Sequence, residues 1–364
     1  MPSAGCFRPR RAKKAMSEPQ RLAIRSPNWL GDAIMALPAM GALRRAYPDA
    51  HLAIAAPASV APLFREQTNA EPASVLSFAD HRGERAALGG AALDLIVLLP
   101  NSFRSAWIAR AAAIRERWGY GAGVRRPLLT RAVARPRRRV HQSQYYLELV
   151  RGLGLEALQE PPRVCVTAET RSRAMTAAAD LGIAADALMI GFAPGAAYGH
   201  AKRWPPPRVS DLIARLTREL AATCVLFGAA GDRAAGREIE SSLPSDVRVI
   251  NAIGRTDLRL LAGLIAQCGA FVSNDSGAMH LAAALGTPLV AIFGPTDERV
   301  TAPLGGRTMP DILSAPVFCR PCLLRDCPID HRCMKRITVD DVLAAVRRRL
   351  PIDRPASAPA EASL

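Results

Sequence analysis

Short apolar segments alternate with helical patterns along almost the whole chain, and this alternation restricts the possible folds more than any other feature. Each apolar segment ends in a polar or glycine-rich turn, and a stretch with apolar residues at helical spacing follows it. Strands that alternate with helices form parallel, doubly wound sheets, because each crossover helix returns the chain to the same edge. The predicted strands are residues 22–26, 51–55, 74–77, 93–99 and 116–120, and then 189–193, 224–228, 247–251, 270–273 and 289–293.

The two series of strands predict an α/β protein with two Rossmann-like domains that face a central cleft. A chain of 364 residues is long enough for two domains of average size. The predicted parts are a disordered basic extension at 1–20, a first domain at 21–155, a proline-containing linker at 156–167, a second domain at 168–350 with a cysteine-rich loop at 319–333, and a disordered tail at 351–364.

The stretch at residues 271–280 runs from a predicted strand directly into a helix of small residues, expected at 281–285. Asn274, Asp275 and Ser276 are residue types that favour a helix N-cap, and free amides at a helix N-terminus hold phosphate or another anion. Gly277 allows close approach to the backbone, and His280 follows Ser276 by about one turn. The stretch therefore predicts an anion site, but an ordinary strand-to-helix turn with a polar cap uses the same residues.

A glycine-rich loop follows the predicted strand at 189–193 and contains a single lysine. Within this loop, PGAAYGHAKRWP at residues 194–205, we expect Gly195, Tyr198 and Lys202 to face a diphosphate-containing donor. The alternative for Lys202 is a surface position beside a packed tryptophan. Neither first strand is followed by G-x-G-x-x-G, and the chain has no Walker A sequence, so redox dinucleotide and P-loop chemistry are less favoured.

Asp32 follows the first predicted strand and begins a helix with apolar residues at helical spacing. In a two-domain arrangement it faces the predicted diphosphate site from the other side of the cleft. One carboxylate opposite a leaving diphosphate suits a general base that activates a hydroxyl group. An aspartate at the start of a helix also serves as an N-cap, and this alternative stays open.

The formal net charge of +16 is concentrated in two places. Residues 1–20 carry five Lys and Arg against one Glu, and residues 101–151 carry twelve Arg against two Glu. Such a basic region suits nucleic acid, an anionic membrane surface or a polyanionic substrate, although a solvated basic face is the simpler explanation. No apolar run is long enough to cross a bilayer and no secretory signal is recognisable, so we expect a cytoplasmic protein.

Cys319, Cys322, Cys327 and Cys333 form a cluster near the end of the second predicted domain. In a cytosolic chain, clustered cysteines favour a structural metal over disulfides, so a structural zinc is one hypothesis. The spacing matches no standard zinc module, and the loop could hold reduced thiols instead.

Five motifs in order resemble glycosyltransferase family 9, the ADP-heptose glycosyltransferases of GT-B fold, and within it the heptosyltransferase II type. They are SPNWLGD at 26–32, LPNSFRS at 99–105, PG at 194–195 followed by AKRWP at 201–205, SNDSGAMH at 273–280, and the cysteine loop at 319–333. The resemblance covers residues 22–350 and departs from the family at Ala197, usually acidic, and at His200, often proline.

The resemblance implies transfer of L-glycero-D-manno-heptose from ADP-heptose to the first heptose of the Kdo–lipid A inner core, with inversion and without a required cofactor. It implies that Asp32 is the base, that Lys202 binds phosphate, and that residues 275–277 and His280 form the donor motif. For the anionic lipid acceptor we expect contacts in the first domain, and the candidates are Asn28, Asn101, Ser102 and Arg104. The acceptor implies an enzyme of lipopolysaccharide biosynthesis that is peripheral at the cytoplasmic face of the inner membrane.

Other functions remain open on the sequence. Heptosyltransferase I, which acts on Kdo, is the nearest alternative, and a sugar-nucleotide epimerase of the same architecture shares the donor site without needing an acceptor. A non-enzymatic nucleic-acid binder would use the arginine cluster, but no recognition motif or aromatic series accompanies that cluster, so we expect no nucleic-acid partner.

Overall fold

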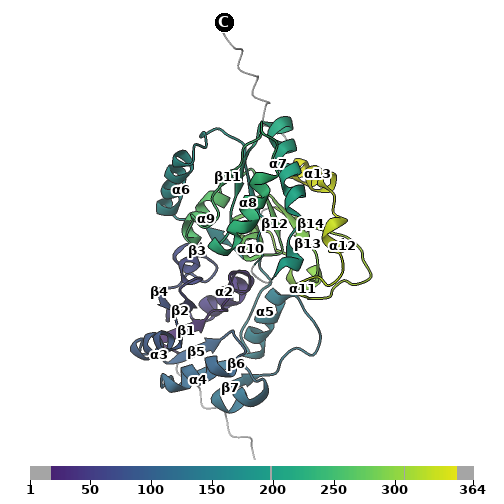
Figure 1. Ribbon diagram of the computed structural model, residues 1–364. Helices are drawn as coiled ribbons and strands as arrows, with labels where there is room; N and C mark the ends of the chain where they lie inside the picture. The colour runs from purple at the N-terminus through teal and green to yellow at the C-terminus, as the bar shows by residue number, and fades with distance from the viewer. Residues whose placement is uncertain (1–17, 197–198, 307, 351–364) are drawn as a thin grey trace, which may run out of the picture.

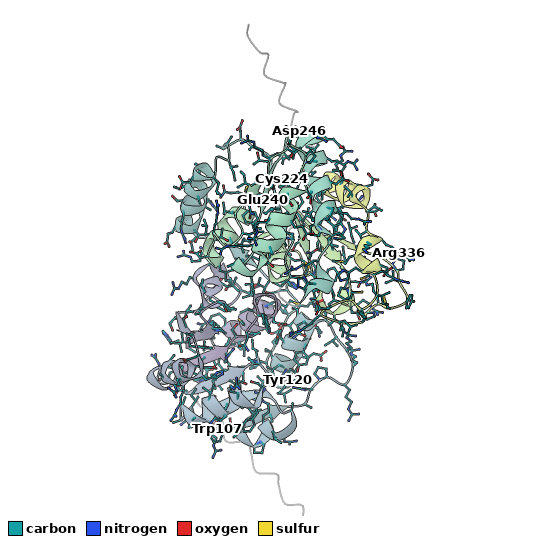
Figure 2. All side chains as sticks on the ribbon, viewed as in Figure 1. Trp107, Tyr120, Cys224, Glu240, Asp246 and Arg336 are labelled. Atoms are coloured by element: carbon teal, nitrogen blue, oxygen red, sulfur yellow. The ribbon has the colours of Figure 1, made fainter. Side chains whose placement is uncertain are left out.

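The computed structural model describes residues 18–196, 199–306 and 308–350 (Figure 1). The predicted tail and residues 1–17 of the predicted extension lie outside these ranges. Two parallel sheets form the framework, with Tyr120 in the lower one and Cys224 in the upper one in Figure 2. We call the first sheet with its packed helices the N-terminal half, and the second sheet with its packed helices the C-terminal half.

The first sheet has six parallel strands in the order β4-β2-β1-β5-β6-β7. Their bounds are β1 (Arg21–Arg25), β2 (His51–Pro57), β4 (Ser74–Phe78), β5 (Leu95–Leu98), β6 (Glu116–Tyr120) and β7 (Arg131–Val133). Ile24 of β1 lies between Ile54 and Val97 of the neighbouring strands. Because helices cover both faces, strands such as β5 are apolar throughout and alternate strand residues enter two separate cores.

Helices cover the two faces of the first sheet as two layers. One layer is α2 (Leu37–Ala46) with α5 (Gln142–Gly152), and the other is α3 (His81–Gly90) with α4 (Phe103–Ala111). A short helix, α1 (Leu30–Met35), precedes α2. The prediction of a single helix here is wrong, because the helix is interrupted at Ala36. This residue lies two positions before Pro38, which is in the first turn of α2.

The second sheet has the order β11-β10-β9-β12-β13-β14, and all its pairs are parallel. Its strands are β9 (Met189–Ala193), β10 (Thr223–Leu226), β11 (Ile250–Asn251), β12 (Ala270–Asn274), β13 (Leu289–Phe293) and β14 (Asp311–Ser314). Helices α7 (Pro206–Leu220), α8 (Arg233–Ser241) and α13 (Val339–Arg349) cover one face, and α9 (Leu258–Ile265) and α10 (Gly277–Leu285) the other. The predicted doubly wound parallel fold is confirmed.

Both sheets reverse their strand order at the first strand, since β1 lies beside β5 and β9 lies beside β12. In open α/β sheets, ligands bind outside the carboxyl ends of the strands at this reversal. Asp32 follows β1, Asn101 follows β5, Gly195 follows β9 and Asp275 follows β12. The topology therefore brings most of the predicted site residues to the two ligand-binding edges.

The two halves contact each other at more than one place. Helix α1 packs against α10, and one apolar core runs continuously through both halves. Glu66, which is buried, accepts hydrogen bonds from the Thr167 amide at 2.7 Å and from Arg259 Nε at 2.6 Å. Within the predicted linker, β8 (Val164–Cys165) pairs with β3 (Gln67–Thr68), and α6 (Ala168–Asp180) follows. No helix in the described ranges has the length and apolar content that crossing a bilayer requires.

Candidate active site

A cavity of about 670 Å³ lies between the two halves and contains most of the predicted site residues. The predicted residues that line it are Asp32, Gly195, Lys202, Asp275, Ser276, Gly277 and His280. Tyr198 and Ala197 lie outside the described residues. Asn28, Asn101, Ser102 and Arg104, the predicted acceptor residues, are not among its lining residues. The proposed base and the donor motif thus share one cavity.

Lys202 and Asp275 form an ion pair within this cavity. Lys202 Nζ lies 2.7 Å from Asp275 Oδ2, and Thr296 donates a hydrogen bond of 2.7 Å to the same oxygen. Both side chains of the pair are largely shielded from solvent, so water screens the charge of the Lys202 ammonium group only weakly. The structure therefore excludes the alternative of Lys202 on the open surface beside a packed tryptophan.

Helix α10 follows β12 as the sequence predicts. It begins at Gly277, four residues before the expected start at residue 281. Ser276 is its N-cap and accepts a hydrogen bond from the Met279 amide at 3.4 Å. Asn274 joins the neighbouring loop to the strand, because its side chain donates to Pro194 O at 2.6 Å and accepts from the Trp204 amide at 3.2 Å. The sequence offered Asn274 only as a cap residue, whereas the structure gives it this positioning role.

Gly195 has a steric reason for lacking a side chain. A Cβ atom added there would lie 2.2 Å from the Asp232 carboxyl carbon, so any larger residue would displace that carboxylate. Asp232 lines the same cavity, and Arg203 approaches it to 3.5 Å. Asp232 is thus a further charged side chain in the cavity that Lys202 and Asp275 line.

Asp32 is not a helix cap. The N-cap of α1 is Trp29, and Asp32 is the third helical residue. Burial, the largest cause, raises the pKa of Asp32; the charge of Lys202 lowers it and the charge of Asp275 raises it again. An aspartate with a raised pKa is a stronger proton acceptor than usual, and it suits general-base chemistry.

His280 is buried where α10 meets α1. Its Cδ2 atom would lie 2.8 Å from a Cβ atom added at Gly31, so the absence of a side chain at Gly31 permits this packing. Burial lowers the pKa of His280 to about 4, with Asp275 opposing the shift and His141 and Lys202 adding to it. At neutral pH the ring is therefore uncharged.

Acid is expected to destabilise the protein through His280. The unfolded chain takes up this proton near pH 6.5 and the folded protein only near pH 4, so stability is fully present above 6.5 and is lost as the pH falls toward 4. The loss is on the order of 3 kcal/mol in the free energy of unfolding. His280→Gln should lack this part of the acid loss when urea unfolding is compared at neutral and acidic pH. Parallel losses in both proteins would contradict the assignment.

The predicted acceptor residues hold local structure at the first sheet. Asn28 accepts a hydrogen bond from Arg25 at 2.7 Å, and Ser102 caps α4 by accepting from the Ser105 amide at 3.2 Å. Arg104 Nη1 lies 2.7 Å from His81 Nε2. Asn101 donates to the Tyr145 hydroxyl at 2.9 Å. None of these contacts tests acceptor binding, which stays a prediction.

Arg125, a residue that the sequence analysis counted only within the basic cluster, is the unexpected member of this region. It is 1% exposed, and its Nη1 donates to Pro100 O at 2.6 Å. Its Nε and Nη2 atoms and Asn101 Oδ1 have no hydrogen-bond partner among the described residues. Burial, followed by repulsion from Arg135, lowers the pKa of Arg125 to about 10, so it remains charged at neutral pH. No sequence signal marks it, since burial is a property of the fold.

Cys319, Cys322 and Cys327 lie in the loop before α12 (Arg332–Lys335), and Cys333 is buried in the first turn of this helix. The His331 amide donates to Cys327 Sγ at 3.3 Å. No group of three or more His, Cys, Asp or Glu side chains in the described ranges is arranged to hold a metal ion. The structural zinc stays a prediction.

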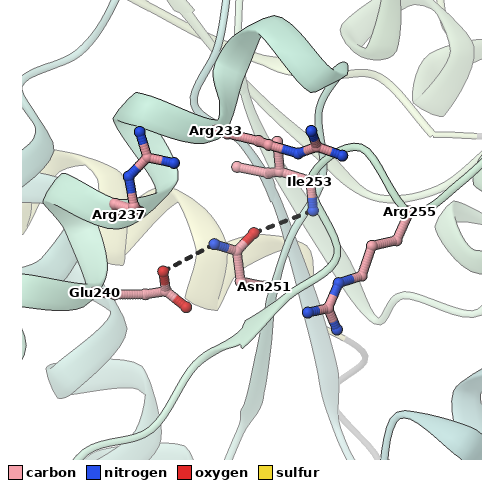
Figure 3. Close-up of a pocket in the computed structure, with 6 residues that line it drawn as sticks. All are labelled: Arg233, Arg237, Glu240, Asn251, Ile253 and Arg255. Carbon is pink, nitrogen blue, oxygen red and sulfur yellow. Dashed lines mark hydrogen bonds between the residues drawn. The ribbon is translucent and has the colours of Figure 1, made fainter.

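A second, smaller cavity of about 210 Å³ lies beside α8 and β11, as Figure 3 shows. Its lining residues are Arg233, Arg237, Glu240, Asn251, Ile253 and Arg255. Asn251 donates to Glu240 Oε2 at 2.9 Å and accepts from the Ile253 amide at 3.1 Å. No predicted site residue lines it, so the candidate active site is the larger cavity.

Comparisons with known proteins show the family of the chain and its fold. Residues 84–332 match the family model described as glycosyltransferase family 9 (heptosyltransferase). Lipopolysaccharide heptosyltransferase 2 of Salmonella typhimurium is 35% identical over 306 residues, which cover 78% of this chain and 85% of the relative. Lipopolysaccharide heptosyltransferase 1 of Pseudomonas aeruginosa is 29% identical over 241 residues, covering 64% and 63%.

Among solved structures, the ADP-heptose lipopolysaccharide heptosyltransferase II of Escherichia coli aligns with a TM-score of 0.76 and 29% identity. This alignment covers 90% of this chain and 98% of that one. The fold, two Rossmann-like sheets across a cavity, is the GT-B arrangement of that enzyme family. The chain therefore belongs to glycosyltransferase family 9, the heptosyltransferases.

Proposed function

We propose that this enzyme transfers L-glycero-D-manno-heptose from ADP-heptose to the first heptose of the Kdo–lipid A inner core. The observation that carries the proposal is the cavity that places Asp32 opposite Lys202 and the N-terminus of α10. The heptosyltransferase 2 relative supports the acceptor assignment, since it matches at higher identity over more of the chain than the heptosyltransferase 1 relative.

In the proposed reaction, Asp32 accepts the proton of the acceptor hydroxyl group. The hydroxyl oxygen then forms a bond to the anomeric carbon of heptose while the bond from that carbon to the diphosphate breaks, with inversion. The departing ADP takes the electron pair, and Lys202 and the amides at the start of α10 stabilise its charge. The reaction needs no cofactor beyond the sugar nucleotide.

We assign residues 21–155 to the acceptor and residues 168–350 to the donor. In the N-terminal half, Arg125 and Asn101 have unpaired polar atoms close to the carboxyl end of β5. Because Arg125 is buried, we assign it the role of holding the Pro100 carbonyl, and with it the loop that carries Asn101 and Ser102, in position for the acceptor. Since the acceptor is lipid-anchored, the enzyme would work peripherally at the cytoplasmic face of the inner membrane.

Replacing Arg125 by Met is expected to raise the acceptor KM by about 10–100-fold, which corresponds to the loss of a charge-assisted hydrogen bond. The KM for ADP-heptose should not change, because Arg125 does not line the cavity that contains the donor motif. Steady-state kinetics with a deacylated acceptor measures both KM values. Arg126→Met, at the exposed neighbour, is the matched control. An equal rise in both KM values would contradict the acceptor assignment.

Acceptor-dependent release of ADP tests the proposed function. The purified enzyme should release ADP from ADP-heptose only when a Kdo-containing acceptor is present. Turnover of the sugar nucleotide without acceptor would instead favour an epimerase. Binding of DNA in the same salt range without ADP release would favour the nucleic-acid alternative.

A further inference from the structure

The outward side of α4 carries two exposed aromatic side chains that the proposed reaction does not use. Phe103 and Trp107 lie one turn apart and are 47% and 53% exposed. Their rings stack, with centroids 6.2 Å apart and planes at 18°. Ala106 and Ile108 on the opposite side of the helix are buried against the sheet. The aromatic pair therefore takes no part in the hydrophobic core.

Basic side chains flank this aromatic pair. Arg104 and Arg110 are exposed on the same helix, and residues 101–115 contain no Asp or Glu. The neighbouring segment η2 (Gly123–Leu128) packs against α4 and adds Val124, which is 78% exposed. We call this surface the α4 face, made of Phe103, Arg104, Trp107, Arg110 and Val124. It combines positive charge with apolar area in one place.

We propose that the α4 face rests on the surface of an anionic phospholipid bilayer. Trp is enriched at the level of lipid headgroups because its ring is amphipathic. Phe and Trp also supply the apolar side of helices that lie in the membrane interface. Arginines beside them are attracted to headgroup phosphates. The charge on the face complements a negative surface, and its apolar side chains gain from entering the interface.

The position of the face agrees with a lipid-anchored acceptor, and this step rests on the proposed function. Figure 2 shows Trp107 at the end of the N-terminal half that points away from the C-terminal half. Helix α4 begins at the carboxyl end of β5, and β5 pairs with β1, which leads to Asp32. A bilayer at the α4 face would thus lie against the half assigned to the acceptor and leave the donor half in solvent.

Arg139, in the basic run at 137–139, does not extend the α4 face. Arg139 Nη1 lies 3.6 Å from Asp297 Oδ2 of the C-terminal half. His141 Nε2, two residues later, lies 3.0 Å from Ala302 O of that half. This part of the basic cluster crosses to the donor side, so the bilayer contact is assigned to α4.

Co-sedimentation of the full-length enzyme with vesicles tests the α4 face. We expect binding to vesicles of phosphatidylcholine with phosphatidylglycerol, weakened by salt, and much weaker binding to phosphatidylcholine alone. The double variant Phe103→Gln/Trp107→Gln should bind about tenfold more weakly. Arg110→Gln should bind about fivefold more weakly. The matched controls are Met175→Gln, an exposed apolar residue on α6, and Arg237→Gln, an exposed arginine of the smaller cavity in Figure 3.

The outcomes distinguish failure of the bilayer proposal from failure of the proposed heptose transfer. The double variant should keep the wild-type kcat with a deacylated acceptor and lose rate only with acceptor embedded in vesicles. Wild-type vesicle binding by the double variant would overturn the proposal. A change in oligomeric mass without any change in vesicle binding would also overturn it and identify a contact between copies. Absence of heptose transfer by the wild type with either acceptor would reject the proposed function while leaving the vesicle result valid.

Discussion

Replacing Asp32 by Asn is expected to lower kcat by about 10²–10⁴-fold, the usual contribution of a positioned general base. Asparagine keeps the shape of the side chain but cannot accept the hydroxyl proton. Binding of ADP should survive, because the amide still fits the cavity and Lys202 remains in place. Single-turnover kinetics and calorimetric titration with ADP measure the two effects. Asp49→Asn, at an exposed carboxylate of the same half, is the control.

The same substitution should not destabilise the fold. Burial raises the pKa of Asp32 above its unfolded value, so the ionised carboxylate reduces stability at every pH above that unfolded value. The asparagine side chain of the variant would carry no such charge, and the melting temperature at neutral pH should stay equal or rise. The pH dependence of the wild-type rate should reflect the same pKa. The rate should fall as the pH drops through the raised pKa of Asp32, because the protonated carboxyl group cannot accept the hydroxyl proton. Retention of more than a tenth of kcat by the variant would remove Asp32 from the catalytic role.

Replacing Lys202 by Met is expected to lower kcat/KM for ADP-heptose by about 10²–10³-fold, as for removal of an electrostatic donor at a developing charge. Both KM and kcat should worsen, because the diphosphate is charged in the ground state and gains charge as ADP departs. The variant also leaves Asp275 without its ion-pair partner in a site shielded from solvent. Removing one member of a buried pair commonly costs about 3–5 kcal/mol.

A double variant separates these two effects of Lys202. Lys202→Met with Asp275→Asn removes the unpaired charge and should recover most of the lost stability. It should not recover activity, because the diphosphate still lacks its cation. Thermal unfolding together with initial rates for the two variants measures this. Recovery of the rate along with stability would show that Lys202 acts only by folding the site.

The framework of the fold could be predicted because its strands are covered by helices on both faces. Residues of β9 and β13 form short apolar runs between polar turns, and their predicted bounds, like those of β6, agree with the structure. The short edge strands β7 and β14 and the β3–β8 pair were missed, since strands of two to four residues with exposed positions carry little periodic signal. The spacing of apolar residues alone also failed to show that the helix is interrupted at Ala36.

The positions of the residues that we assign to the donor could be predicted better than the positions of those that we assign to the acceptor. Asp275, Ser276 and Gly277 directly follow β12, so their location depends on one strand end and one helix start. The role of Arg125 depends on burial and on unpaired atoms created by tertiary packing, which no local pattern reveals. The contact from Arg139 to Asp297 joins residues far apart in sequence, so counting charges along the chain could not reveal it.

The central claim, heptose transfer to an acceptor that already carries one heptose, is tested most directly by mass spectrometry of the acceptor. Purified enzyme and ADP-heptose would be incubated with Kdo–lipid A acceptors that bear no heptose or one heptose. We predict that the acceptor with one heptose gains a single further heptose and that the acceptor without heptose stays unchanged. Equal or faster modification of the acceptor without heptose would contradict the account and assign the enzyme to the first transfer.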